Sequence, residues 1–151
     1  MKSLLLSLLF SVLSLSSMWA NNPIPDAVQK AFHQLFPAIE NPFWENRQEG
    51  LVATFRDEEG FKKVFFTPEG QWQETRLRVY PAELPIGIKN FIQTHYQVAD
   101  ITYLGRIESA ESVYYRIESE LPDRIVLKKL DEQGVLLQEE VIWLSLNADQ
   151  L

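Results

Sequence analysis

Two stretches of the chain carry apolar residues at helical spacing, and each opens with an aliphatic residue followed by proline. We expect a first helix that starts near Pro25 and ends before Pro37, because the residue before a proline is pushed out of helical space. We expect a second helix from about Ala82 to Tyr96, although Gly87 lies inside it at a cost of about 1 kcal/mol relative to alanine. The matching apolar positions are Val28, Ala31, Phe32 and Phe36 in the first stretch, and Ile88, Phe91, Ile92 and Tyr96 in the second.

Each expected helix is followed by four short runs with strand-like composition. The turn between the third and fourth runs is Thr67-Pro68-Glu69-Gly70 in the first set, a type I signature, and Asp131-Glu132-Gln133-Gly134 in the second. Loops this short join neighbouring strands as hairpins, so each set predicts an antiparallel meander. The runs cover residues 43–47, 51–56, 61–66 and 71–79, and then 101–108, 113–119, 124–130 and 135–146.

The repeated order of elements predicts an α+β fold built as a tandem repeat of a helix plus a four-stranded antiparallel meander. The expected organisation is a signal peptide at residues 1–20, a first unit at 21–80 and a second unit at 81–151, with the helices on one face of a sheet. The last residues, 147–151, are expected to fray.

Residues 1–20 have one lysine, a short apolar run with serines and a terminal Ala20, which is typical of a secretory signal peptide. Cleavage can fall after Ser17 or after Ala20. An uncleaved anchor is the alternative, but the apolar run is shorter than the roughly 20 residues of a spanning helix. The chain has no cysteine, which excludes a lipid-anchoring cysteine and disulfides. We expect a periplasmic or secreted protein with no stable membrane insertion after cleavage.

The 151-residue chain has a formal net charge of −7. Loss of Lys2 with the signal peptide makes the mature chain more acidic by one unit. No Lys/Arg stripe offsets this charge, so nucleic acid is not an expected partner.

The pattern resembles the PepSY-like, beta-lactamase-inhibitor-like (BLIP-like) family of exported bacterial proteins. The resemblance rests on the signal peptide, on the motif from Ile24 to Pro37 followed by Trp44, on residues 66–72 and on the second Leu84-Pro85 start. It implies two four-stranded sheets joined edge to edge, helices on one face and an open face opposite. Proteins of similar architecture include a secreted inhibitor that grips beta-lactamases with that open face. The resemblance implies no catalytic residue.

Nothing in the sequence predicts catalysis, a metal site or a cofactor. His33 and His95 do not match in the repeat and lack further ligands at zinc spacing. There is no Gly-x-Ser-x-Gly elbow and no phosphate loop. The acidic runs at 57–59 and 131–132 lack the spacing of a calcium loop and are interpreted as solvated turns.

Aromatic pairs give the one indication of function. Neighbours in a strand point to opposite faces, so one member of each pair, such as Phe43 and Trp44, should lie on the face that helices leave open. We take Trp44, Trp72, Tyr103 and Tyr114 as candidate partner-binding residues on that face. The alternative is that the rings cover the second face by cross-strand packing or form a dimer contact.

The sequence therefore predicts an exported, non-catalytic module that binds an unidentified protein or peptide, and an inhibitor of an envelope or secreted hydrolase is the sharper form of this hypothesis. A small-ligand carrier that uses the same face is the alternative, and a closed apolar pocket between sheet and helices would favour it.

Overall fold

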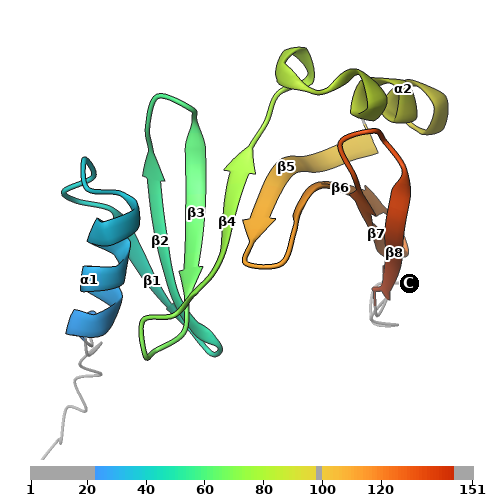
Figure 1. Ribbon diagram of the computed structural model, residues 1–151. Coiled ribbons are helices and arrows are strands. Elements are labelled where there is room, and N and C mark those ends of the chain that lie inside the picture. Colours follow the sequence, from blue (N-terminus) through green and yellow to red (C-terminus); the bar gives the residue numbers. More distant parts are fainter. Residues whose placement is uncertain (1–22, 98–99, 145–151) are drawn as a thin grey trace, which may run out of the picture.

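The computed structural model describes residues 23–97 and 100–144. They form one continuous sheet of eight antiparallel strands, in which each strand pairs with the next along the chain. The sheet twists strongly from β1 to β8 (Figure 1). The elements are α1 (Asp26–Leu35), β1 (Phe43–Arg47), β2 (Gly50–Arg56), β3 (Phe61–Phe66), β4 (Trp72–Arg78), the 3₁₀ turn η1 (Pro81–Glu83), α2 (Ile86–His95), β5 (Ile101–Ser109), β6 (Val113–Leu121), β7 (Arg124–Leu130) and β8 (Leu136–Trp143).

The expected α+β class and the antiparallel meanders are confirmed. The two four-stranded sheets are joined edge to edge into one sheet, as expected, because β4 pairs with β5 from Glu74 opposite Ser109 to Arg78 opposite Gly105. The hydrogen bonds between β4 and β5 therefore join the first half of the sheet to the second.

Both helices lie on the same face of the sheet. The cross-strand register links Leu77 to Arg106 and Arg106 to Tyr115, so one side of β4 continues as the side of β6 that α2 covers. Figure 1 shows α1 beside the first half of the sheet and α2 beside the second. Two apolar cores result: α1 packs Val28 and Phe32 on Leu51, Ala53, Phe55, Val64 and Phe66, and α2 packs Ile88 and Ile92 on Leu84, Leu104, Tyr115, Ile117 and Leu130.

Helix α2 begins later than its periodicity predicts. Residues 81–83 form the separate turn η1, and Leu84 is extended, with φ −71° and ψ 146°. Pro85 explains the break, since it disfavours helical geometry at the residue before it. The prediction of one helix from Ala82 is therefore wrong, and α1 and α2 both start directly after a proline.

The expected signal peptide at 1–20 and the expected frayed tail at 147–151 lie outside the described residues. Within the part of the chain that the structure describes, no helix has both the length and the apolarity to span a membrane.

Candidate functional site

The sheet has one face without a helix, formed by every second residue of each strand, and we call it the helix-free face. Its membership follows from the register of the strands, since residues directly opposite each other share a face. From β1 to β4 its members are Phe43, Glu45, Arg47, Val52, Thr54, Arg56, Phe61, Lys63, Phe65, Glu74, Arg76 and Arg78. From β5 to β8 they are Tyr103, Gly105, Ile107, Ser109, Tyr114, Arg116, Glu118, Glu120, Ile125, Leu127, Lys129, Gln138, Glu140 and Ile142.

Two apolar side chains on this face are buried although no helix covers them. Val52 is 1% exposed and Ile107 is 0% exposed. Val52 lies opposite Phe65, and Ile107 lies between Arg76 and Tyr114. Aromatic rings and the aliphatic stems of long charged side chains therefore cover the centre of the face.

Cations stack on aromatic rings at two places on this face. The guanidinium carbon of Arg76 lies 4.2 Å from the Phe65 ring centroid, and that of Arg47 lies 5.8 Å from the same ring. The Lys129 ammonium lies 4.0 Å from the Tyr114 ring centroid. Such contacts are worth about 0.5–1 kcal/mol at exposed sites, so they hold the rings and cations in place.

The Tyr103 ring lies over Gly105, which has no side chain to keep the ring away from the sheet. A β-carbon at Gly105 would collide with the Tyr103 hydroxyl and ring. Burial raises the pKa of Tyr103 and of Tyr114 above the ordinary tyrosine value. Both hydroxyls are therefore protonated at neutral pH and can donate a hydrogen bond to a partner.

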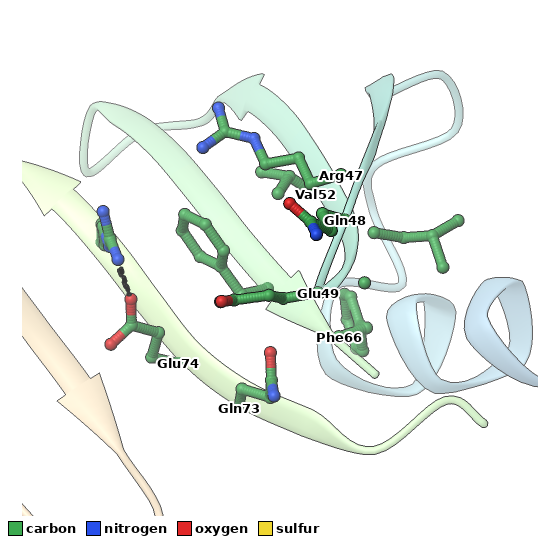
Figure 2. Close-up of a pocket in the computed structure, with 11 residues that line it drawn as sticks. Arg47, Gln48, Glu49, Val52, Phe66, Gln73 and Glu74 are labelled. Atoms are coloured by element: carbon green, nitrogen blue, oxygen red, sulfur yellow. Dashed lines mark hydrogen bonds and ion pairs between the residues drawn. The ribbon is translucent and has the colours of Figure 1, made fainter. Parts of the chain in front are cut away.

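A hollow of about 510 Å³ opens beside the turn that joins β1 to β2. Figure 2 shows Arg47, Gln48 and Glu49 on one side of it and Gln73 and Glu74 on the other. Val52 and Phe65 contribute apolar surface to its lining, and the Arg76 Nε donates to the Glu74 Oε1 at 2.6 Å. The lining of the hollow is therefore mainly polar and charged.

Charge is divided unequally between the helix-free face and the rest of the molecule. The face carries seven cations and five acids, for a net charge of +2, whereas the other described residues carry six cations and fifteen acids, for a net charge of −9. The cations are Arg47, Arg56, Lys63, Arg76, Arg78, Arg116 and Lys129, and the acids are Glu45, Glu74, Glu118, Glu120 and Glu140. An acidic protein thus presents a mildly basic sheet face.

The structure separates the four candidate residues into two pairs. Tyr103 and Tyr114 lie on the helix-free face, as expected. The placement of Trp44 and Trp72 there is wrong, since both pack against the core beneath α1. The Trp44 ring packs edge-on against the Phe32 ring, with 5.4 Å between the ring centroids. The Trp72 Nε1 donates a hydrogen bond to the Thr75 Oγ1 at 3.0 Å.

Residues outside the four candidates complete the face. Phe65 and Phe61 lie there in place of the two tryptophans, and the arginines beside them come from different strands. Phe65 and Phe66 are neighbours in one strand, so the sequence indicates that one of the two rings faces away from the helices. The structure shows that this ring is Phe65, because Phe66 is fully buried beneath α1.

The acidic turn after β2 is occupied by a lysine. The Lys62 ammonium lies 2.6 Å from the Asp57 Oδ2 and 2.6 Å from the Glu59 Oε2, and Lys62 is only 7% exposed. Burial alone would raise the pKa of Asp57 and lower that of Lys62. The hydrogen bonds and charges between them outweigh burial, so the pKa of Asp57 is lowered and that of Lys62 is raised.

The other titratable groups do not assemble a reactive site in the part of the chain described. No group of three His, Cys, Asp or Glu side chains there is placed to hold a metal ion. His95 stacks on Phe91 and its Nδ1 lies 2.9 Å from the Phe91 carbonyl oxygen, and Asp131 accepts from the Val135 N–H at 2.8 Å.

A second cavity, of about 300 Å³, lies between the segment leading into α2 and the start of β5. Its lining is mainly apolar, in contrast to the hollow on the helix-free face. The apolar and aromatic members of the lining are Val79, Tyr80, Pro81, Leu84, Ile92, Ile101, Tyr103 and Leu104. It is partly open, so it only partly fits the closed pocket that a small-ligand carrier would have.

Comparison with known proteins shows a likeness in fold. No protein-family model matches the chain, and no curated protein matches it. A BLIP-like protein from Bacteroides fragilis superposes with a TM-score of 0.67 at 21% identity, covering 85% of this chain and 92% of that one. A DUF2874 family protein from Bacteroides ovatus superposes with a TM-score of 0.67 at 21% identity, covering 78% of this chain and 86% of that one.

A protein from Bacteroides eggerthii that is provisionally described as periplasmic gives 0.66 at 20% identity, covering 79% of this chain and 89% of that one. The chain therefore has the fold of these structures. The BLIP-like part of the resemblance is supported at the level of fold, and the PepSY-like part stays a prediction.

Proposed function

We propose that this protein is exported to the periplasm or beyond, has no catalytic activity, and binds a protein or peptide through its helix-free face. The observation that supports this most directly is the group of rings on that face, Phe65, Tyr103 and Tyr114, each held by cations or by a glycine beneath it. Rigid aromatic rings next to arginine are the residue types that dominate protein interfaces. The fold likeness to a BLIP-like protein and to a provisionally periplasmic protein is in keeping with this function.

The sharper form of the proposal is an inhibitor of an envelope or secreted hydrolase. The face is already ordered without a partner, since cross-strand packing buries Val52 and Ile107. A preordered surface loses little conformational entropy on binding, which is what tight inhibition requires. We also propose that the two units of a helix and four strands are a duplicated, PepSY-like repeat.

Affinity capture from the native envelope fraction tests the proposal. The bait is the chain from residue 21, compared with a Tyr103→Ser/Tyr114→Ser variant. We expect one stoichiometric protein with the first bait and its loss with the second. If the captured protein is a hydrolase, its activity should fall when an equimolar amount of the first bait is added. An empty eluate from a folded bait would contradict the proposal.

A small-ligand carrier is the second candidate, and the apolar 300 Å³ cavity beside α2 is the observation that favours it. Its volume is at the lower end of the range for ligand pockets. A Gln93→Trp variant, at an exposed position of the lining, would narrow this cavity and leave the helix-free face intact. Loss of ligand-induced thermal stabilisation in that variant, with unchanged protein capture, would support the carrier function.

A further inference from the structure

Six cations of the helix-free face lie in two adjacent rows that cross the sheet at right angles to the strands. One row runs from Arg78 through Gly105, Arg116 and Lys129 to Gln138, each directly opposite the next. Arg56, opposite Phe61, stands at the β2 end of this row. The neighbouring row is Thr54, Lys63, Arg76, Ile107 and Tyr114. We call these six side chains, Arg56, Lys63, Arg76, Arg78, Arg116 and Lys129, the basic band.

The two rows contain no acid. The flanking rows do, and there Glu74 pairs with Arg76 and Glu118 lies 2.8 Å from the Arg116 Nε. Among the ion pairs of the residues described, none involves Arg56, Arg78 or Lys129. The Arg116 Nε is buried and, despite its neighbour Glu118, has no aligned hydrogen-bond acceptor. The band therefore retains cationic groups that are not fully paired by the described residues.

Two pairs in the band place like charges directly across from each other. Lys63 is opposite Arg76, and Arg116 is opposite Lys129. Directly opposed like charges destabilise a sheet, whereas opposite charges at such positions stabilise it. On the helix-covered face the chain uses the stabilising arrangement, with Lys128 opposite Glu139 at 3.3 Å. A bound anionic group would relieve the repulsion in the band.

The band has the length of a short peptide. It extends from β2 to β7, which is roughly 24 Å at the usual spacing between strands. An extended peptide of about seven residues covers this distance. Phe61, Tyr103 and Tyr114 lie within or beside the rows and offer apolar contact between the charges.

The charge around the band limits what can bind there. The described residues outside the helix-free face carry a net charge of −9, so a long polyanion that continued past this face would be repelled. A short acidic segment of a protein can pair with the cations of the band without extending into the negatively charged surroundings.

The geometry points to an acidic, extended segment of about seven residues, supplied by a protein partner, as the group that the basic band recognises. This inference rests on the proposed binding function of the helix-free face and adds the chemistry of the partner.

Fluorescence anisotropy with labelled heptaglutamate at low ionic strength tests the inference. The wild-type chain from residue 21 should bind this probe, more weakly as salt is added. Arg116→Gln/Lys129→Gln should weaken binding about tenfold. The matched control Arg106→Gln/Lys128→Gln removes the same charge from the helix-covered face and should leave the affinity unchanged. Arg56→Gln/Arg78→Gln, at exposed positions, is a second test pair if the first does not fold.

No binding of heptaglutamate, tighter binding of heptalysine, or equal weakening by band and control variants would overturn the inference. Binding of tripolyphosphate without binding of heptaglutamate would assign the band to phosphate groups and overturn it as well. The proposed function fails separately. A captured partner that is lost with Tyr103→Ser/Tyr114→Ser but kept with Arg116→Gln/Lys129→Gln would leave that function standing and exclude the acidic segment.

Discussion

The α-carbon of Gly134, in the turn between β7 and β8, packs against the backbone of Gly87 in the first turn of α2. A β-carbon on either glycine would overlap the other segment. In the first half of the chain, Gly70 makes the same approach to the carbonyl of Ala27, again in the first turn of a helix. Gly70 and Gly134 both have positive φ, at 87° and 84°. The glycine inside α2, unfavourable for a helix, is thus explained by the turn that lies on it.

Gly87→Ala should destabilise the protein even though alanine favours helix. The new methyl group would displace the backbone at Gln133, and overpacking of this kind costs about 1–3 kcal/mol. Urea unfolding would measure the change. Asn90→Ala, at an exposed position of the same helix, should be neutral or slightly stabilising. Equal gains in both variants would show that the turn does not press on α2.

Trp44→Ala should cost about 2–4 kcal/mol of unfolding free energy, because the ring packs into the core beneath α1. Phe43→Ala is the matched control, since Phe43 is the adjacent residue, points to the other face and is 68% exposed. It should change stability by less than about 0.5 kcal/mol. A larger effect at Phe43 than at Trp44 would reverse the assignment of faces in β1.

The Asp57–Lys62 pair should make stability depend on pH in acid. The pKa of folded Asp57 is below the ordinary 3.8, so its stabilising contribution is complete above that value and is lost as the pH falls through the folded pKa. The pKa of Lys62 is raised above 10.5, so its contribution is lost only as the pH rises beyond that value. The pair is therefore stabilising across the neutral range.

Asp57→Asn should lower the unfolding free energy by about 1–2 kcal/mol at pH 7 and by less at pH 3. Asparagine keeps the acceptor for the Glu59 and Gly60 N–H groups, so the change isolates the charge. Glu58→Gln, which removes an acid from the same turn that forms no ion pair in the structure, should have little effect at either pH. If the difference in unfolding free energy between wild type and Asp57→Asn were the same at pH 7 and pH 3, the stabilising role of the Asp57 charge would be contradicted.

Residues 21–80 alone should not form a stable monomer. Their removal from the second unit would leave β4 without its partner β5 and expose unpaired backbone groups along that strand. Size-exclusion chromatography with circular dichroism should show an unfolded or self-associating chain. A folded monomer would show that the first unit is independent of the shared sheet.

Local patterns predicted the elements well. The runs 43–47, 61–66 and 124–130 are strands with the predicted bounds, because short turn-forming segments limit them on both sides. The second helix was less well predicted. The apolar periodicity continues through Leu84-Pro85, whereas the proline interrupts the helical conformation at Leu84.

The side on which each aromatic lies was harder to predict. Alternation fixes that Phe43 and Trp44 face opposite sides, but only packing against Phe32 determines which one faces the helix. For Trp72 the irregular register between Phe65 and Phe66 adds a further shift.

The basic band could not be found by scanning the sequence. The expectation that no Lys/Arg stripe exists holds along the chain and is wrong across the sheet. Arg78, Arg116 and Lys129 come from three different strands, and only the cross-strand register places them in one row. The β4–β5 register depends on pairing across the segment that contains α2, and the registers of the β5–β6 and β6–β7 hairpins depend on the geometry of their turns. Local composition encodes neither.

The unequal division of charge between the helix-free face and the other described residues separates the centres of positive and negative charge, which gives this part of the chain an electric dipole. A charged partner would exert a torque on this dipole before any contact forms, so encounters would begin with one side of the sheet already turned toward it. Orientation during diffusion, as well as contact, would then contribute to the selection of partners, and this contribution would fade as added salt shortens the screening length.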